Sequence, residues 1–181
     1  MGEPNMKGQD EKTIQALETA LQMEIEGKEF YYKAGQASHN PLAKKLLLRL
    51  AEEEDVHIEK VNEICEAIKS KASWPEKETT FKHEKSLRSV FREAIEDMDK
   101  EIKASSSELE ALKVAMNMED KSYSFYRSRD EEAASPTEKS FYQALTAEER
   151  EHYLTLLDSY EYLTDPQSWF AKKEHWSLDG V

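Results

Sequence analysis

The sequence has few of the residues on which several fold and site classes depend. It contains one cysteine, Cys65, which excludes an internal disulfide, a cysteine-ligated zinc site and a cysteine-ligated iron–sulfur cluster within one chain. Five glycines and five prolines are too few for a turn-rich β-sandwich or a collagen-like rod. No apolar run approaches the roughly 20 residues of a membrane-spanning helix. The first residues, MGEPNMKGQDEKT, lack the hydrophobic stretch of a secretion signal, so we expect a cytoplasmic protein.

Negative charge, by contrast, is in large excess. The chain has 38 acidic and 25 basic residues and a formal net charge of −13 at pH 7. Nucleic acids and anionic membranes bind basic surfaces, so this charge argues against both as partners. With 38% hydrophobic residues the chain is long enough to bury a core, and we expect a single domain over residues 1–181.

The two halves of the chain repeat each other at an offset of 95 residues, without a gap. The offset aligns two glutamates, a tyrosine, a proline and a histidine of each half: Glu24 with Glu119, Tyr31 with Tyr126, Pro41 with Pro136, Glu54 with Glu149 and His57 with His152. A chance match of two Glu-rich helices would explain the glutamates alone, but not the other three types in the same register. The repeat therefore indicates a duplicated helical hairpin that contributes to one shared site.

Apolar residues recur every three or four positions in four long segments, which predicts helices over about 10–37, 41–69, 106–129 and 136–163. Asn40-Pro41 and Ser135-Pro136 place a capping residue and a proline at two of the helix starts. Short turns make each helix pair an antiparallel hairpin, and the long connection 70–105 contains a further amphipathic helix from Leu87 to Ile102. We expect an all-α, ferritin-like four-helix bundle with a long crossover. The aromatic tail 164–181 is expected to pack back on a surface.

The apolar residues that recur every three or four positions form a stripe along one face of each predicted helix. Six polar side chains lie on these stripes, where apolar ones are expected: Glu24, Glu54, His57, Glu119, Glu149 and His152. Burying an unpaired carboxylate costs several kcal/mol, and four together would repel one another. Lys28 supplies one positive charge for four acids. Two divalent metal ions would neutralise the four carboxylates, while neutral imidazoles complete the coordination. We therefore predict that these six residues are metal ligands.

The spacing of these residues supports the same prediction. Glu54-x-x-His57 and Glu149-x-x-His152 each place a carboxylate and an imidazole on one helix face, 30 residues after Glu24 and Glu119. One glutamate from each of two helices and a Glu-x-x-His pair from each of the others is the ligand set of ferritin-like dimetal proteins. Oxygen-rich coordination favours iron or manganese over structural zinc. These donor types do not separate iron from manganese, so both metals stay open at this point.

Several residues beside the six also have expected positions. Tyr31 and Tyr126 lie two turns beyond Glu24 and Glu119, where a phenol can hydrogen-bond a ligating carboxylate across the bundle or can simply fill the core. We expect ordinary positions for a further set of residues: Glu52, Glu53 and Glu148 facing water, Cys65 as a buried thiol, and His39, His83 and His175 at the surface or in tail packing.

Four segments resemble the metal-bearing helices of rubrerythrin-like diiron carboxylate proteins: MEIEGKEFYYKA, LAEEEDVHIEKV, MNMEDKSYSFYRS and LTAEEREHYLTLL. The resemblance spans about residues 10–165. It implies the six residues above as diiron ligands, Tyr31 and Tyr126 as their hydrogen-bonding tyrosines, and reduction of peroxide or oxygen as the activity. Two features depart from the family: the chain lacks the Cys-x-x-Cys pairs of a rubredoxin module, and Ser122 replaces an additional glutamate of the third helix.

Three functions follow from such a site. The first is an oxidoreductase that reduces hydrogen peroxide or O₂ with electrons from an external donor protein. The second is iron binding without turnover, for storage or sensing, and the third is a manganese catalase-like activity. A homodimer is expected by analogy with the family.

Overall fold

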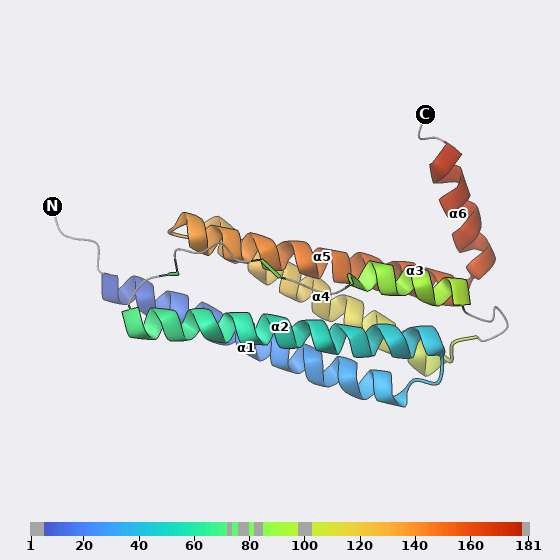
Figure 1. Ribbon diagram of the computed structural model, residues 1–181, viewed down its shortest axis with the longest axis horizontal. Coiled ribbons are helices and arrows are strands. Elements are labelled where there is room, and N and C mark those ends of the chain that lie inside the picture. The colour runs from blue at the N-terminus through green and yellow to red at the C-terminus, as the bar shows by residue number, and fades with distance from the viewer. Residues whose placement is uncertain (1–5, 72–73, 76–79, 82–84, 98–102, 179–181) are drawn as a thin grey trace.

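The computed structural model describes residues 6–71, 74–75, 80–81, 85–97 and 103–178, and every regular element among them is a helix. The bundle consists of four long helices, α1 (Met6–Ala37), α2 (Pro41–Lys71), α4 (Ser106–Glu132) and α5 (Pro136–Thr164) (Figure 1). Helix α1 pairs with α2 and α4 with α5, and the two hairpins face each other through α1–α4 and α2–α5 contacts. The predicted all-α bundle of two hairpins is confirmed.

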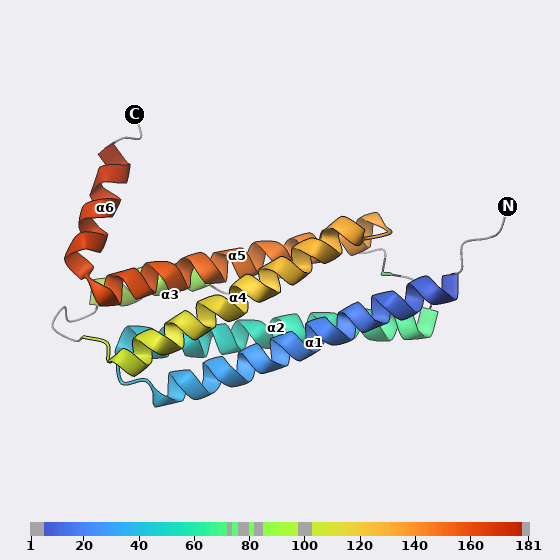
Figure 2. The same cartoon turned by 180° about the vertical axis from the view of Figure 1, so that it is seen from behind.

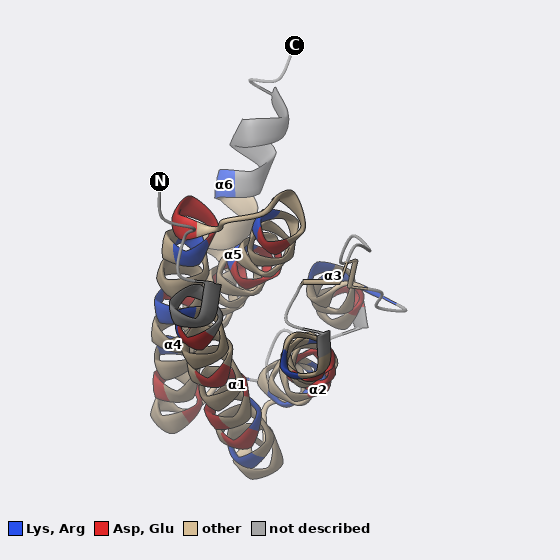
Figure 3. Ribbon diagram, turned by 90° about the vertical axis from the view of Figure 1, so that its left-hand side faces the viewer, with Lys and Arg blue, Asp and Glu red and all other residues tan. Residues whose placement is uncertain are grey.

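The two wide faces of the bundle differ in what covers them. Helix α3 (Leu87–Asp97) in the crossover packs against both α2 and α5, on the outside of the bundle (Figure 3). Trp74, also in the crossover, contacts the rings of Phe141 and Tyr142 on α5. The opposite, α1–α4 side carries no further described element (Figure 2). The predicted crossover helix is confirmed over Leu87–Asp97, while Met98 and Ile102 lie outside the described residues.

The C-terminal aromatic segment differs from the prediction. Instead of a tail laid back on the surface, it forms helix α6 (Pro166–Leu178), which projects away from the bundle at the end of α5 (Figure 1). Its first turns are anchored on the bundle: Trp169 is buried against Phe91 and Tyr162, and Phe170 also contacts Tyr162. Asp165 starts the new helix by accepting hydrogen bonds from the backbone and hydroxyl of Ser168. The side chains of His175 and Trp176 lie outside the described part.

Capping fixes the hairpin turns at both predicted sites. The Asn40 side chain accepts from the backbone of Leu42 and Ala43, and the Ser135 hydroxyl accepts from the backbone of Glu138. A buried glutamate, Glu108, also joins the two hairpins. Its carboxylate accepts hydrogen bonds from the backbone N–H groups of His39, Asn40 and Ser105. Burial alone would raise the pKa of Glu108, but these bonds lower it to about 2.

The core is divided into two apolar clusters. One includes Leu46 and Leu112 near the α1–α2 turn, and the other includes Leu17 and Leu145 near the other end of the bundle. Along α2, the first cluster ends at Ala51 and the second begins ten residues later, at Val61. The polar residues predicted to bind metal lie in this interval and at the matching level of the other helices. The fold therefore holds a polar layer between two apolar ones.

Two further points concern the burial of the cysteine and the length of the apolar helices. Cys65 is buried, as predicted, and packs in the second apolar cluster. In the described part of the chain, no helix combines the length and apolar character needed to cross a bilayer.

Candidate metal centre

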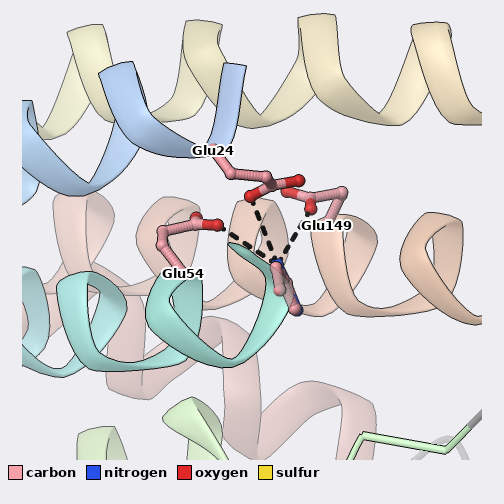
Figure 4. A group of neighbouring side chains, drawn as sticks. Glu24, Glu54 and Glu149 are labelled. Atoms are coloured by element: carbon pink, nitrogen blue, oxygen red, sulfur yellow. Dashed lines mark hydrogen bonds and ion pairs between the residues drawn. The ribbon is translucent and has the colours of Figure 1, made fainter. Parts of the chain in front are cut away.

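The structure brings all six predicted side chains together in the middle of the bundle. Each long helix supplies part of the set, and every one of the six is at most 2% exposed: Glu24 from α1, Glu54 and His57 from α2, Glu119 from α4, and Glu149 and His152 from α5. Figure 4 shows Glu24, Glu54 and Glu149 converging from three different helices. Their positions follow from the repeat, because equivalent helices of the two halves turn equivalent faces toward the axis of the bundle.

The six side chains form two overlapping groups of four. One group contains Glu24, Glu54, His57 and Glu149, the other contains Glu54, Glu119, Glu149 and His152, and in each the ligand atoms lie within 4.8 Å of one another. Glu54 and Glu149 belong to both groups. The Oε1 atom of Glu149 is 3.6 Å from Nδ1 of His57, while its Oε2 atom is 3.9 Å from Nδ1 of His152. A carboxylate with one oxygen toward each histidine can bridge two ions.

Burial and mutual repulsion shift the pKa values of the four carboxyls of this cluster. Burial, together with the charge of Glu24, raises the pKa of Glu54, and burial with the charges of Glu119 and Glu24 raises that of Glu149. Burial also opposes ionisation of Glu24, but the hydrogen bond from Glu54 and the adjacent His57 lower its pKa to about 2. Glu119 is paired in the same way with Glu149, and its pKa is also lowered. In each half of the site, one carboxyl thus holds its proton more tightly than a free glutamate does, and its partner holds it less tightly.

The carboxylates of the cluster favour the protonated form of the two histidines. Burial alone would lower the pKa of His57 and of His152, but the surrounding carboxylates, chiefly Glu24 for His57 and Glu119 for His152, raise both. The cation Lys28 does not serve the site, because its ammonium pairs instead with Asp55.

The two tyrosines link the repeats crosswise. Tyr126 of α4 donates a hydrogen bond from its hydroxyl to Oε1 of Glu24 on α1, and Tyr31 of α1 bonds Glu119 on α4. Both rings are buried. Burial and the nearby carboxylates raise the pKa of both phenols well above 10, so the hydroxyls stay protonated and act as donors. The other oxygen of Glu24, Oε2, lies 3.4 Å from Nδ1 of His57.

Several buried atoms of the cluster lack a hydrogen-bond partner among the described residues. They are Oε1 of Glu119, Oε1 of Glu149 and Nδ1 of His152. A buried acceptor without a partner costs about 1–3 kcal/mol, so native proteins seldom leave three in one place. Carboxylate oxygens and an imidazole nitrogen are ligand atoms for iron and manganese. The residues present therefore fit a metal centre.

The structure corrects the prediction for Glu53, which faces the interior rather than water. It is 2% exposed, and its Oε2 atom lies 2.8 Å from Nε2 of His152. Its Oε1 atom accepts from Nε of Arg49 at 2.8 Å, and Arg49 also donates to the backbone carbonyl of Lys85. Glu52 is exposed, as predicted, whereas Glu148, the repeat equivalent of Glu53, is half-buried and helps to raise the pKa of His57.

The contact between Glu53 and His152 has a chemical consequence. Because Glu53 accepts the proton of Nε2, the lone pair of the neutral ring lies on Nδ1, which faces Glu119 and Glu149. Glu53 therefore favours the tautomer that leaves Nδ1 available as a ligand atom. Two features of the sequence could have indicated that Glu53 is buried. Arg49 lies four residues before it, and Glu148 is an acid at the equivalent position of the other repeat.

We expect Glu53→Gln to weaken metal binding by about 10- to 100-fold, because His152 loses an anionic hydrogen-bond partner. The matched control is Glu52→Gln, since Glu52 also bonds Arg49 but is exposed. Competition with a coloured chelator measures both affinities. Equal affinities for the two variants would contradict the assigned role of Glu53.

The crossover closes one side of the site. Phe81 packs edge-on against the ring of His57, with 4.8 Å between the ring centroids. Of the three histidines predicted to lie away from the site, His39 is exposed at the α1–α2 turn, and the side chains of His83 and His175 lie outside the described part.

Comparison with known families agrees with this geometry. The sequence model of the rubrerythrin family matches residues 15–160, a span that includes all six buried glutamates and histidines of the site. The chain belongs to the rubrerythrin family. No curated protein and no solved structure gives a significant match. Family membership supports the interpretation of the buried cluster as a metal site, and the ferritin-like bundle is the fold expected of a rubrerythrin.

Proposed function

We propose that this rubrerythrin-family protein binds two iron ions in the six-residue cluster and reduces hydrogen peroxide or O₂ with electrons from a separate donor protein. The observation that carries the proposal is the sharing of Glu54 and Glu149 between two four-donor groups. A single ion would need only one of these groups. Two shared carboxylates suit a pair of adjacent ions.

In such a site each ion is offered one histidine, one carboxylate of its own and the two shared carboxylates. A pair of reduced iron ions held by these residues would supply the two electrons that reduction of peroxide needs. The four carboxylates neutralise four positive charges, so the pair can be buried without excess charge. Manganese fits the same donors, which keeps the catalase-like alternative open.

The chain's own residues hold the site in shape. Tyr126 hydrogen-bonds Glu24, and Tyr31 hydrogen-bonds Glu119. The raised pKa of both phenols keeps their hydroxyls protonated as hydrogen-bond donors. Glu53 orients His152. The two apolar clusters above and below the polar layer exclude water, which strengthens the electrostatic interactions within it.

Electrons are proposed to come from outside the chain. The sole thiol, Cys65, packs in an apolar cluster, and burial raises its pKa, which opposes formation of a thiolate. A separate donor protein would therefore complete the reaction 2 e⁻ + 2 H⁺ + H₂O₂ → 2 H₂O. The excess negative charge of the chain favours a basic partner for this role.

Anaerobic peroxide consumption tests this function. We expect protein loaded with two equivalents of Fe²⁺ to consume peroxide at least tenfold faster than the same concentration of free Fe²⁺, and to turn over repeatedly when a reductant is supplied. A rate equal to that of free Fe²⁺, with iron bound, would favour storage or sensing instead. Evolution of O₂ by manganese-loaded protein without reductant would favour the catalase-like alternative.

A further inference from the structure

A small cavity joins the candidate metal centre to the surface on the α1–α4 side. Its volume is about 110 Å³, and it is bounded by residues from the surface down to the site: exposed Glu26 and Lys121 at the rim, half-buried Met23, Met118 and Ser122 along the walls, and buried Gly27, Tyr31, Glu24 and Glu54 at the floor. Two of the floor residues thus belong to the metal-binding cluster. The cavity leads directly to their carboxylates.

The walls are formed by repeat-related pairs. Met23 corresponds to Met118, Glu26 to Lys121 and Gly27 to Ser122 at the 95-residue offset. The cavity therefore lies where α1 and α4 meet, on the side that no other described helix covers (Figure 2). On the opposite side, Phe81 packs on His57 and α3 spans α2 and α5. The α1–α4 side is thus the open approach to the site.

Gly27 contributes to the cavity because it has no side chain to fill the space. A Cβ atom at this position would lie 3.4 Å from Cε2 of Tyr31 and 3.8 Å from Oε1 of Glu54, which is ordinary contact. Gly35 in the same helix is different, because a Cβ there would lie 2.9 Å from the side chain of Leu48. A helix-interior glycine with room for a methyl group weakens its helix without a steric reason. What it leaves free is the space over the Glu54 carboxylate.

We propose that this cavity is the entry port for the oxidant, and that Gly27 and Ser122 set its size limit. The inference rests on the proposed function. A space of this volume has room for a molecule of a few non-hydrogen atoms, such as hydrogen peroxide or O₂. The rim carries one acid and one base, so a neutral molecule meets no net charge there.

The test uses azide, a linear anion of three atoms, as the probe of access. Wild-type, Ser122→Leu and Ser124→Leu proteins are first brought to equal iron content, and azide binding is then followed by absorption spectroscopy. Ser124 is exposed on the same helix, so its variant is a matched control for the substitution itself. We expect Ser122→Leu to reduce the azide association rate at least tenfold, and Ser124→Leu to leave it unchanged.

Gly27→Ala provides a second test that does not depend on tolerance of the larger leucine. It is expected to raise the melting temperature, since alanine favours the helix, and yet to slow azide binding. Equal azide rates in iron-loaded Ser122→Leu and Ser124→Leu, or an unchanged rate in Gly27→Ala, would overturn the port alone. Wild-type protein that binds no iron would remove the proposed function, and the port with it.

Discussion

Glu54→Gln is expected to abolish tight binding of both metal ions, whereas Glu24→Gln is expected to remove only one. Glu54 belongs to both four-donor groups, while Glu24 belongs to one of them. An amide oxygen is a neutral and weaker ligand than a carboxylate, so each affected ion loses a negative charge as well as a bond. We expect at least a 100-fold loss of affinity at each affected position. Metal analysis after equilibrium dialysis measures how many ions remain.

The same variants report on folding, which separates loss of ligands from loss of structure. Burial and the charge of Glu24 raise the pKa of Glu54, so above the pKa of a free glutamate the metal-free protein must take up a proton at this carboxyl in order to fold. A neutral glutamine removes that requirement. Metal-free Glu54→Gln should therefore melt at or above the temperature of metal-free wild type. Retention of two tightly bound ions by this variant would contradict the shared role of Glu54.

The sequence was sufficient to predict the fold and the cluster because their signals are periodic. In a helix bundle, a stripe with spacings of three and four determines which residues face inward, and Glu24 and Glu119 interrupt such stripes. The 95-residue repeat then shows that these polar residues occur at equivalent positions in the two halves of the chain. Burial of these side chains in the structure follows the same geometry.

Glu53 escaped prediction because it lies beside the stripe rather than on it. Neighbouring residues on a helix are about 100° apart, so Glu53 and Glu54 cannot both point at the bundle axis. Glu53 instead faces α5, where its burial depends on His152 and Arg49. That environment is created by another helix, and no local pattern in α2 specifies it. Phe81 in the aperiodic crossover is similar, because only the folded chain places it on His57.

The direction of α6 could not be predicted for a related reason. Trp169 and Phe170 indicate that the segment makes apolar contacts, but they do not say which surface receives them. In the structure, the first turn of α6 is anchored on Phe91 of the crossover helix and on Tyr162 of α5. These partners come from two distant parts of the sequence.

The metal-free protein is expected to lose stability as the pH rises from about 5 to about 8, and iron is expected to reverse the trend. The folded-state pKa values of Glu54, Glu149, His57 and His152 are all raised. A raised pKa stabilises the fold below the unfolded-state value, about 4.5 for glutamate and 6.5 for histidine. That stability is lost as the pH rises through the folded-state value. Toward pH 2 the sign reverses, because Glu24 and Glu108 have lowered pKa values.

Metal binding has the opposite pH dependence, since iron competes with the protons on these ligands and binds more tightly as the pH rises. At a free metal concentration 1,000 times the dissociation constant, binding adds about 4 kcal/mol, which for a domain of this size raises the melting temperature by roughly 8–16 °C. Differential scanning calorimetry under anaerobic conditions, with and without Fe²⁺ from pH 5 to 8, measures both trends. The stabilisation by Fe²⁺ should widen with pH in wild type and nearly vanish in Glu54→Gln. If metal-free wild type gained stability across this range, or if Fe²⁺ raised the melting temperature equally at every pH, the buried carboxylates would not be holding protons that a metal displaces.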